Sequence, residues 1–126
     1  SPMSRGLGDV YKRQDELFAC EETVEVFRKA GVIIGLDDYG AGVITAADIA
    51  AFPFDLVKSD RSICGFEDAW DSPLHGELMQ VSQSKPLVLI AEGIEKVEQA
   101  TGLAALGYQY VQGYAFDQPT MLIQRN

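Results

Sequence analysis

The chain has 126 residues, of which 47% are hydrophobic and 23% are charged, and its formal net charge at pH 7 is −9. It is long enough for one core but short for an α/β barrel, which typically needs about 250 residues. The negative charge argues against a nucleic-acid polymer as partner, and no apolar run reaches the ~20 residues of a membrane span.

Residues 1–14 differ in composition from the rest of the chain. They show no hydrophobic period, and residues 4–14 are similar to one reading frame of a transposon sequencing adapter. We expect this segment to be a non-native or disordered leader, so it does not enter the fold prediction.

An amphipathic helix is predicted over Asp15–Ala30, where apolar residues recur at helical spacing. Gly31 is the residue type that commonly follows the last residue of a helix. The segment Gly31–Asp38 then predicts a short strand buried on both faces, because Val32–Ile34 and Leu36 are all apolar.

Two adjacent carboxylates, Asp37 and Asp38, end this strand, and Gly40 and Gly42 follow where the backbone must turn. In parallel α/β sheets, ligands and chemistry are found at the carboxyl ends of the strands. Neighbouring acids repel each other unless a cation neutralises them, so the pair indicates a divalent-metal site. The structural alternative is that Asp37 only ends the strand while Asp38 forms an Asx turn or caps the next helix.

Helices and strands alternate along the rest of the chain. The helix Thr45–Phe52 has a capping-box-like start, with Asp48 three residues after its first residue, and it ends at Pro53. The segment Arg61–Asp71 fits neither pattern, and the tail 115–126 is too short for another βα unit. The remaining predicted elements are the strands Phe54–Lys58, Leu87–Ala91 and Tyr108–Val111 and the helices Leu74–Ser84 and Ile94–Leu106.

Each predicted strand ends in polar side chains. The alternation of strands and helices predicts a parallel α/β arrangement, in which all strand ends of one kind meet at the same edge. Helix capping alone does not explain why carboxylates, a lysine and an amide all occur at that edge. These strand-end residues are Asp37 and Asp38, Lys58 with Asp60, Glu92, and Gln112.

Four motifs in order carry a resemblance to a known family. L-D-D-Y-G-A-G, F-P-F-D-L-V-K-S-D-R-S, A-E-G-I-E and Y-V-Q-G-Y-A-F closely resemble the second half of an EAL domain, a bacterial cyclic-di-GMP phosphodiesterase. The resemblance runs from Phe27 to Pro119. It implies an α/β fold, a partial TIM-type (β/α) barrel with about the last four βα units, and makes residues 15–126 the C-terminal part of an EAL-type domain.

The resemblance also implies roles in hydrolysing cyclic-di-GMP to the linear dinucleotide with two Mg²⁺ or Mn²⁺ ions. Asp37 would bridge the two ions and Asp38 would bind one of them. Lys58 would orient the reactive water or balance its charge, and Glu92 would act on the metal–water cluster, as ligand or general base. Asp60, Glu95 and Gln112 would occupy supporting positions around the site and the ligand.

The chain departs from the family pattern in several places. Ala41 stands where a hydroxyl residue is usual, and Ser59 replaces the usual aliphatic residue between Lys58 and Asp60. The Glu-Ala-Leu strand is missing, as are an asparagine and a second glutamate of the metal shell. We therefore expect the two-metal site to be incomplete and the chain itself to be inactive.

Other interpretations stay open. Taken singly, Lys58 could be a solvated strand-end lysine, and Glu92 and Glu95 could be first-turn acids favoured by a helix dipole. A receiver domain does not fit, because Lys85 precedes its strand whereas the receiver lysine ends one. A Rossmann domain does not fit, because the glycine pattern after Gly40 and Gly42 needs Gly or Ala where Thr45 stands. The remaining rivals are a degenerate EAL domain that binds cyclic-di-GMP or a protein without hydrolysis, and an enolase-type Mg²⁺-dependent barrel.

The other unusual residues are expected to be structural or on the surface, namely Cys20, Cys64, Trp70 and His75, while Gly102 should weaken its helix. Cysteines without metal-ligand spacing are typical of small buried thiols in a reducing cytoplasm. The expected partner is cyclic-di-GMP. A homodimer and attached sensory domains are compatible with the resemblance.

Overall fold

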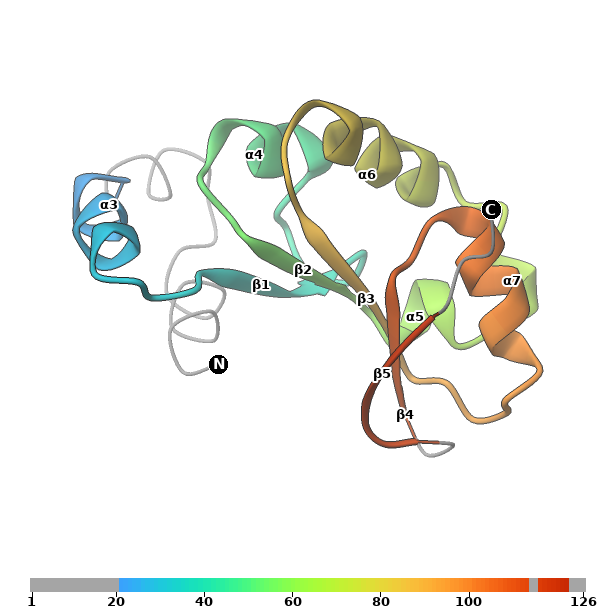
Figure 1. The fold of residues 1–126 in the computed structure, drawn as a ribbon. Coiled ribbons are helices and arrows are strands. Elements are labelled where there is room, and N and C mark those ends of the chain that lie inside the picture. The colour runs from blue at the N-terminus through green and yellow to red at the C-terminus, as the bar shows by residue number, and fades with distance from the viewer. Residues whose placement is uncertain (1–20, 114–115, 123–126) are drawn as a thin grey trace.

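The computed structural model describes residues 21–113 and 116–122 (Figure 1). Five strands form one sheet in the order β1-β2-β3-β4-β5. The leader 1–14, the first part of the helix predicted over Asp15–Ala30, and Cys20 lie outside the described residues. The strands are β1 (Gly35–Tyr39), β2 (Leu56–Ser59), β3 (Val88–Glu92), β4 (Tyr110–Gly113) and β5 (Phe116–Met121), and the helical elements are α3 (Glu21–Lys29), α4 (Ala46–Ala51), α5 (Arg61–Cys64), the 3-10 turn η1 (Glu67–Ala69), α6 (Pro73–Ser84) and α7 (Gln99–Leu106).

The predicted α/β architecture with parallel strands is confirmed for β1 to β4, which pair in parallel with their neighbours. β5 was not predicted; it pairs antiparallel with β4. A hairpin partner needs only a short turn and no crossover helix, which is why a tail too short for a βα unit still supplies a strand.

The first strand begins later than predicted. α3 ends in a Schellman motif, in which the Val32 N–H bonds to the Phe27 carbonyl and the Gly31 N–H to the Arg28 carbonyl, with φ of +87° at Gly31. This turn places the side chains of Val32 and Ile33 outside the core, where they are 36% and 65% exposed. The prediction of a strand from Gly31, buried on both faces, was therefore wrong at its beginning, whereas the glycine stop of the helix is confirmed.

Two other boundaries differ from the sequence prediction. The segment Arg61–Asp71, which fitted no pattern, contains α5 and η1. α7 begins at Gln99, five residues after the predicted start at Ile94. The intervening loop is held by the Gln99 side chain, whose Oε1 accepts from the N–H groups of Glu95 and Lys96, both at 3.0 Å. A side chain that satisfies loop amides in this way replaces the first helical turn.

The core lies on one side of the sheet. Figure 1 shows α4, α6 and α7 on that side, and alternate strand residues facing it are buried, namely Leu36, Val57, Leu89, Ala91 and Val111. The residues that point the other way are mostly half-buried, and Val88 is 38% exposed. We call this second side the inner face; on it lie Leu56, Lys58, Val88, Ile90, Glu92, Tyr110 and Gln112.

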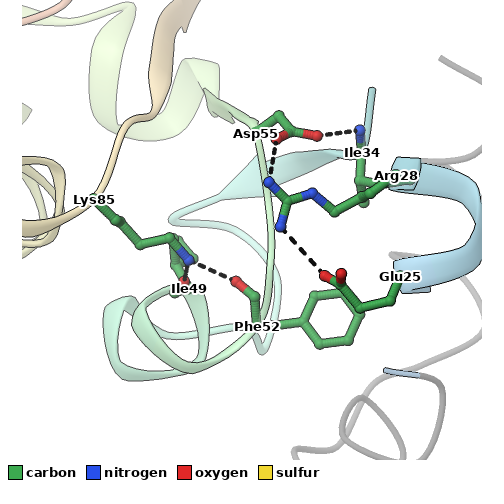
Figure 2. Close-up of polar contacts among 7 residues, drawn as sticks. All are labelled: Glu25, Arg28, Ile34, Ile49, Phe52, Asp55 and Lys85. Atoms are coloured by element: carbon green, nitrogen blue, oxygen red, sulfur yellow. Dashed lines mark hydrogen bonds and ion pairs between the residues drawn. The ribbon is translucent and has the colours of Figure 1, made fainter. Parts of the chain in front are cut away.

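Polar contacts fasten the amino end of the sheet (Figure 2). Asp55 accepts a 2.9 Å hydrogen bond from the Ile34 N–H and forms a 3.2 Å ion pair with Arg28. Lys85 Nζ donates to the carbonyls of Ile49 and Phe52 at 2.9 and 2.8 Å, at the carboxyl end of α4. Burial lowers the pKa of Lys85, and its contact with helix-end carbonyls suits a cation. These contacts serve the fold, because they lie at the end of the strands opposite to Lys58 and Glu92.

Trp70 explains the glycine in the middle of α7. The Trp70 Nε1–H donates to the Cys64 carbonyl at 2.8 Å, and the indole ring occupies the space where a Cβ on Gly102 would lie. Gly102 therefore permits a close contact between α7 and the segment after α5.

We expect Gly102→Ala to destabilise the chain by about 1–3 kcal/mol, as overpacking usually does, even though alanine is the better helix former. Gly76→Ala is the matched control, because Gly76 lies inside α6 and a Cβ there meets no atom within 4 Å. It should stabilise by about 0.5–1 kcal/mol. Urea unfolding followed by circular dichroism measures both, and equal effects of the two substitutions would contradict the packing explanation.

No helix among the described residues is long and apolar enough to cross a membrane; the longest, α6, has 12 residues.

Candidate functional site

The predicted site residues of three neighbouring strands meet at the carboxyl edge of the sheet. Lys58 Nζ of β2 lies 3.5 Å from Glu92 Oε1 of β3 and 4.0 Å from Asp37 Oδ1 of β1. All three side chains are about one quarter exposed, so water reaches the cluster. A lysine between two carboxylates neutralises part of their repulsion and holds both acids on the inner face.

An irregularity in β1 keeps the side chains of both Asp37 and Asp38 out of the core. Leu36 pairs with Val57 and Tyr39 with Ser59, so β1 has one residue more than β2 between these pairs. In a regular strand one of two consecutive side chains would point into the core, but this extra residue leaves Asp37 half-buried and Asp38 exposed. The bulge is therefore the local reason that an acidic pair is tolerated here.

The backbone at Asp38 is left-handed, with φ of +66°. Aspartate tolerates this conformation better than most residues, and the Asp38 carbonyl accepts from the N–H groups of Ala41 and Gly42, both at 2.9 Å. The glycine at position 40 is required by its φ of +99° and by the Ile63 side chain against it. The predicted tight turn after the acids is thus confirmed.

The carboxylates influence one another across the cluster. The pKa of Glu92 is raised, chiefly because burial disfavours its charged form, and the charges of Asp37 and Asp38 raise it further. The Lys58 ammonium opposes this shift. Asp37, Asp38 and Glu92 therefore act as one electrostatic unit with Lys58 at its centre.

Gln112 adds an unsatisfied acceptor beside Glu92. The two residues are register partners in β3 and β4, and the Gln112 carbonyl accepts from the Ile94 N–H at 3.2 Å. Its side-chain Oε1 is buried and has no hydrogen-bond partner in the described part of the chain. A buried acceptor without a partner costs about 1–3 kcal/mol, so water, a ligand or residues outside the described part of the chain must supply the donor or cation.

We call Lys58 with Asp37 and Glu92 the lysine cluster. Asp60 and Glu95 make their side-chain contacts elsewhere. The Asp60 side chain caps α5 by accepting from the Ser62 N–H at 2.9 Å. Glu95 is exposed and forms a 3.1 Å ion pair with Arg61. The structure therefore places both residues at the rim, where they order the loops after β2 and β3.

Sequence reasoning missed Arg61 and Gln99, which join these two loops. The stem of Arg61 packs where a Cβ on Gly93 would lie, and its guanidinium lies 5.2 Å from the centre of the Phe66 ring. Gln99 Nε2 donates to the Gly65 carbonyl at 3.0 Å. The small residues at 65 and 93 were the only sequence signal of this close contact.

Two of the residues expected to be structural are confirmed as buried. The Cys64 thiol is fully buried, and burial raises its pKa to about 12, which makes it a poor nucleophile or metal ligand. His75 is 2% exposed and makes its hydrogen bonds away from the lysine cluster.

The cluster fits a divalent cation only in part. Carboxylate oxygens are the ligands that Mg²⁺ and Mn²⁺ prefer, and the partnerless Gln112 Oε1 is a further oxygen donor. Among residues 21–113 and 116–122, however, no group of three or more His, Cys, Asp or Glu side chains is arranged to hold a metal ion. The chain thus presents carboxylate and amide oxygens at this edge but no complete metal-binding group among the described residues.

Comparison with known proteins gives a consistent answer. The model of the EAL domain family matches residues 9–119. Cyclic di-GMP phosphodiesterase PdeL of Escherichia coli is 30% identical over 90 residues, covering 70% of this chain and 25% of that protein. Cyclic di-GMP phosphodiesterase NbdA of Pseudomonas aeruginosa is 32% identical over 101 residues, covering 79% of this chain and 13% of that protein.

Solved structures agree. The PaMucR phosphodiesterase in complex with c-di-GMP superposes with a TM-score of 0.68 at 27% identity, covering 82% of this chain and 47% of that one. The fold is also that of Klebsiella pneumoniae BlrP1 in its manganese and c-di-GMP complex, with a TM-score of 0.70 at 22% identity, covering 90% of this chain and 29% of that one. The chain spans 25% of PdeL, 13% of NbdA and less than half of the PaMucR chain.

Proposed function

The chain belongs to the EAL domain family, and from this premise we propose that it forms the C-terminal part of a barrel that hydrolyses cyclic-di-GMP to the linear dinucleotide. The observation that carries the proposal is the cluster at the carboxyl edge of the sheet, where Lys58 lies between Glu92 and Asp37. Cyclic-di-GMP is the substrate named for the phosphodiesterases PdeL and NbdA.

Mg²⁺ or Mn²⁺ would be held by Asp37, Asp38 and Glu92 together with ligands from the rest of the barrel. When bound, such ions neutralise charge on the phosphodiester and make a coordinated water more acidic. The partnerless Gln112 Oε1 on the same face supports a ligand at this place.

The side chains of this chain would then have separate tasks. Lys58 holds the two acids in place and orients the attacking water by its positive charge. Glu92 would bind the ion or accept the proton of that water, since it lies at the same strand end as Lys58. Gln112 contacts the ligand, whereas Asp60 and Glu95 keep the surrounding loops in position.

A complete barrel tests this function. Residues 21–122 would replace the part of the PaMucR phosphodiesterase that they match in fold, which is 47% of that chain. With Mn²⁺ present, chromatography should show the linear dinucleotide forming from cyclic-di-GMP. Binding without turnover would instead favour the degenerate, regulatory EAL domain, and proton abstraction from a carbon acid without phosphodiester cleavage would favour the enolase-type rival.

We expect Lys58→Ala in this barrel to lower kcat by about 100-fold, the range seen when a charged donor at a reacting centre is removed. Substrate binding measured with Ca²⁺ in place of Mn²⁺ should remain, because no carboxylate ligand is lost. Lys96→Ala removes an exposed lysine after Glu95 and is the matched control. If binding disappears together with turnover, Lys58 is a substrate anchor or a structural residue.

A further inference from the structure

A buried chain of hydrogen bonds runs behind the lysine cluster. The Tyr108 hydroxyl lies 2.8 Å from Ser59 Oγ and 2.8 Å from His75 Nδ1. His75 Nε2 lies 2.8 Å from the Ile63 carbonyl. The three side chains are at most 2% exposed, so they form a polar network inside an otherwise apolar core.

The network joins elements that are distant in sequence. Ser59 ends β2, Ile63 belongs to α5, His75 lies in α6, and Tyr108 precedes β4. The hydroxyl–hydroxyl contact between Ser59 and Tyr108 spans 49 residues. The end of β2 is therefore connected, on the core side of the sheet, to the residue before β4 and through it to α6.

Lys58 directly precedes Ser59 in β2. Successive side chains of a strand point to opposite faces, so Ser59 faces the network while Lys58 faces Glu92 and Asp37. Asp60, on the other side of Ser59, caps α5, whose Ile63 carbonyl receives the His75 contact. Movement of Ser59 would thus shift Lys58 and Asp60 together.

Each of the three side chains makes a hydrogen-bond contact within this group, and the Tyr108 hydroxyl contacts both of the others. The Ile63 carbonyl can only accept, so His75 Nε2 must carry a proton. An aliphatic residue at position 59 would leave the Tyr108 hydroxyl with one partner fewer inside the core. A hydroxyl side chain at position 59 is therefore suited to the position facing Tyr108 and His75.

We propose that Tyr108, with His75 and Ser59, is a positioning residue that fixes the end of β2 so that Lys58 stays between Asp37 and Glu92. The network touches none of the reacting groups, and its action runs through Lys58. The expected effect of Tyr108 on turnover rests on the proposed function, but its expected effect on how firmly Lys58 is held does not.

The first test measures how well Lys58 is held in the 126-residue chain, kept at a concentration at which sedimentation shows it to be monomeric. Brief acetylation followed by peptide mass spectrometry gives the rate at Lys58 relative to that at Lys96 in the same molecule. Tyr108→Phe, which removes only the hydroxyl, should raise the relative rate at Lys58 about fivefold, the factor that corresponds to one hydrogen bond of about 1 kcal/mol. Ser59→Ala should do the same, and the double variant should add little to either.

Tyr39→Phe is the matched control. Its side chain is also buried, and although Tyr39 pairs with Ser59 in the sheet, its hydroxyl donates to the Leu74 carbonyl at 2.7 Å in α6 and makes no hydrogen bond to Ser59. It should leave the relative rate at Lys58 unchanged. If Tyr39→Phe raises the rate as much as Tyr108→Phe, or if Tyr108→Phe has no effect, the proposal is overturned.

His75 gives an independent spectroscopic readout, because it is the single histidine of the sequence. Nitrogen-15 NMR should show its proton on Nε2, held by the Ile63 carbonyl. A neutral ring protonated on Nδ1 would contradict the network.

A double-mutant cycle in the complete barrel separates positioning from general stability. Tyr108→Phe should lower kcat about fivefold with KM unchanged, and should have no further effect once Lys58 is alanine. Equal effects in both backgrounds would show that Tyr108 does not act through Lys58. A folded barrel without any turnover would instead refute the proposed function, and acetylation would still decide whether the network holds Lys58.

Discussion

Replacing Asp37 with asparagine should lower kcat/KM of the complete barrel for cyclic-di-GMP by about 100-fold or more, because loss of even an outer-shell partner of a metal site commonly costs 10–100-fold. Asparagine keeps the shape of the side chain but gives up its charge. Asp37 is the acid of β1 that lies within 4.0 Å of Lys58. The variant therefore loses both the proposed metal ligand and one of the two carboxylates that lie beside Lys58.

Glu77→Gln is the charge-matched control for this substitution, because Glu77 is exposed on α6, which packs on the side of the sheet opposite to the inner face. It should leave turnover unchanged within a factor of about two, as expected for a surface residue outside such features. Raising the Mn²⁺ concentration should partly restore Asp37→Asn if ligand loss is the cause. Undiminished turnover in Asp37→Asn would refute its role as a metal ligand.

The 126-residue chain on its own is expected to show no measurable hydrolysis of cyclic-di-GMP. The described residues hold no complete metal-binding group, so Mn²⁺ should bind weakly. Electron paramagnetic resonance of added Mn²⁺ measures that binding, and the turnover assay used for the complete barrel measures activity. Restoration of turnover after the separately produced N-terminal half is added would confirm that the missing ligands are the cause.

The inner face should also drive association of the isolated chain. Val88 is 38% exposed there, and the half-buried side chains around it include Leu56 and Tyr110. We expect sedimentation to show oligomers or aggregates whose size increases with concentration, because an open apolar sheet face and an unpaired strand edge both favour self-association. A monodisperse monomer with measurable turnover would contradict this prediction.

The parts of the fold that follow local rules were predictable from the sequence. Thr45 and Asp48 form the predicted capping box, with both reciprocal bonds present, and Gly31 ends α3 as expected. Such caps depend on contacts within one turn of the chain, so sequence spacing is sufficient to identify them. The parallel order of β1 to β4 follows from the alternation of strands and helices.

The parts that depend on long-range contacts were not predictable. The bulge that turns Asp38 away from the core is fixed by the pairing of Tyr39 with Ser59, and periodicity within one strand cannot show it. The hydrogen bond from Arg61 to Glu95 joins residues 34 positions apart. The network of Ser59, His75 and Tyr108 joins β2, α6 and the residue before β4. Sequence spacing identified the acids and the lysine of the site, but not the side chains that hold them in place.

The order of the strands has a consequence for the way the chain is made. Each strand pairs with the strand that precedes it in the sequence, from β1 to β5 without interruption. The sheet can therefore grow by one strand at a time as the polypeptide leaves the ribosome, and the loop that must close at each step contains only the helical elements between two neighbouring strands or, for β5, a hairpin turn. At every stage of synthesis the edge of the most recently made strand would be exposed to other nascent chains, and the antiparallel β5 would cover the edge of β4 once it emerges.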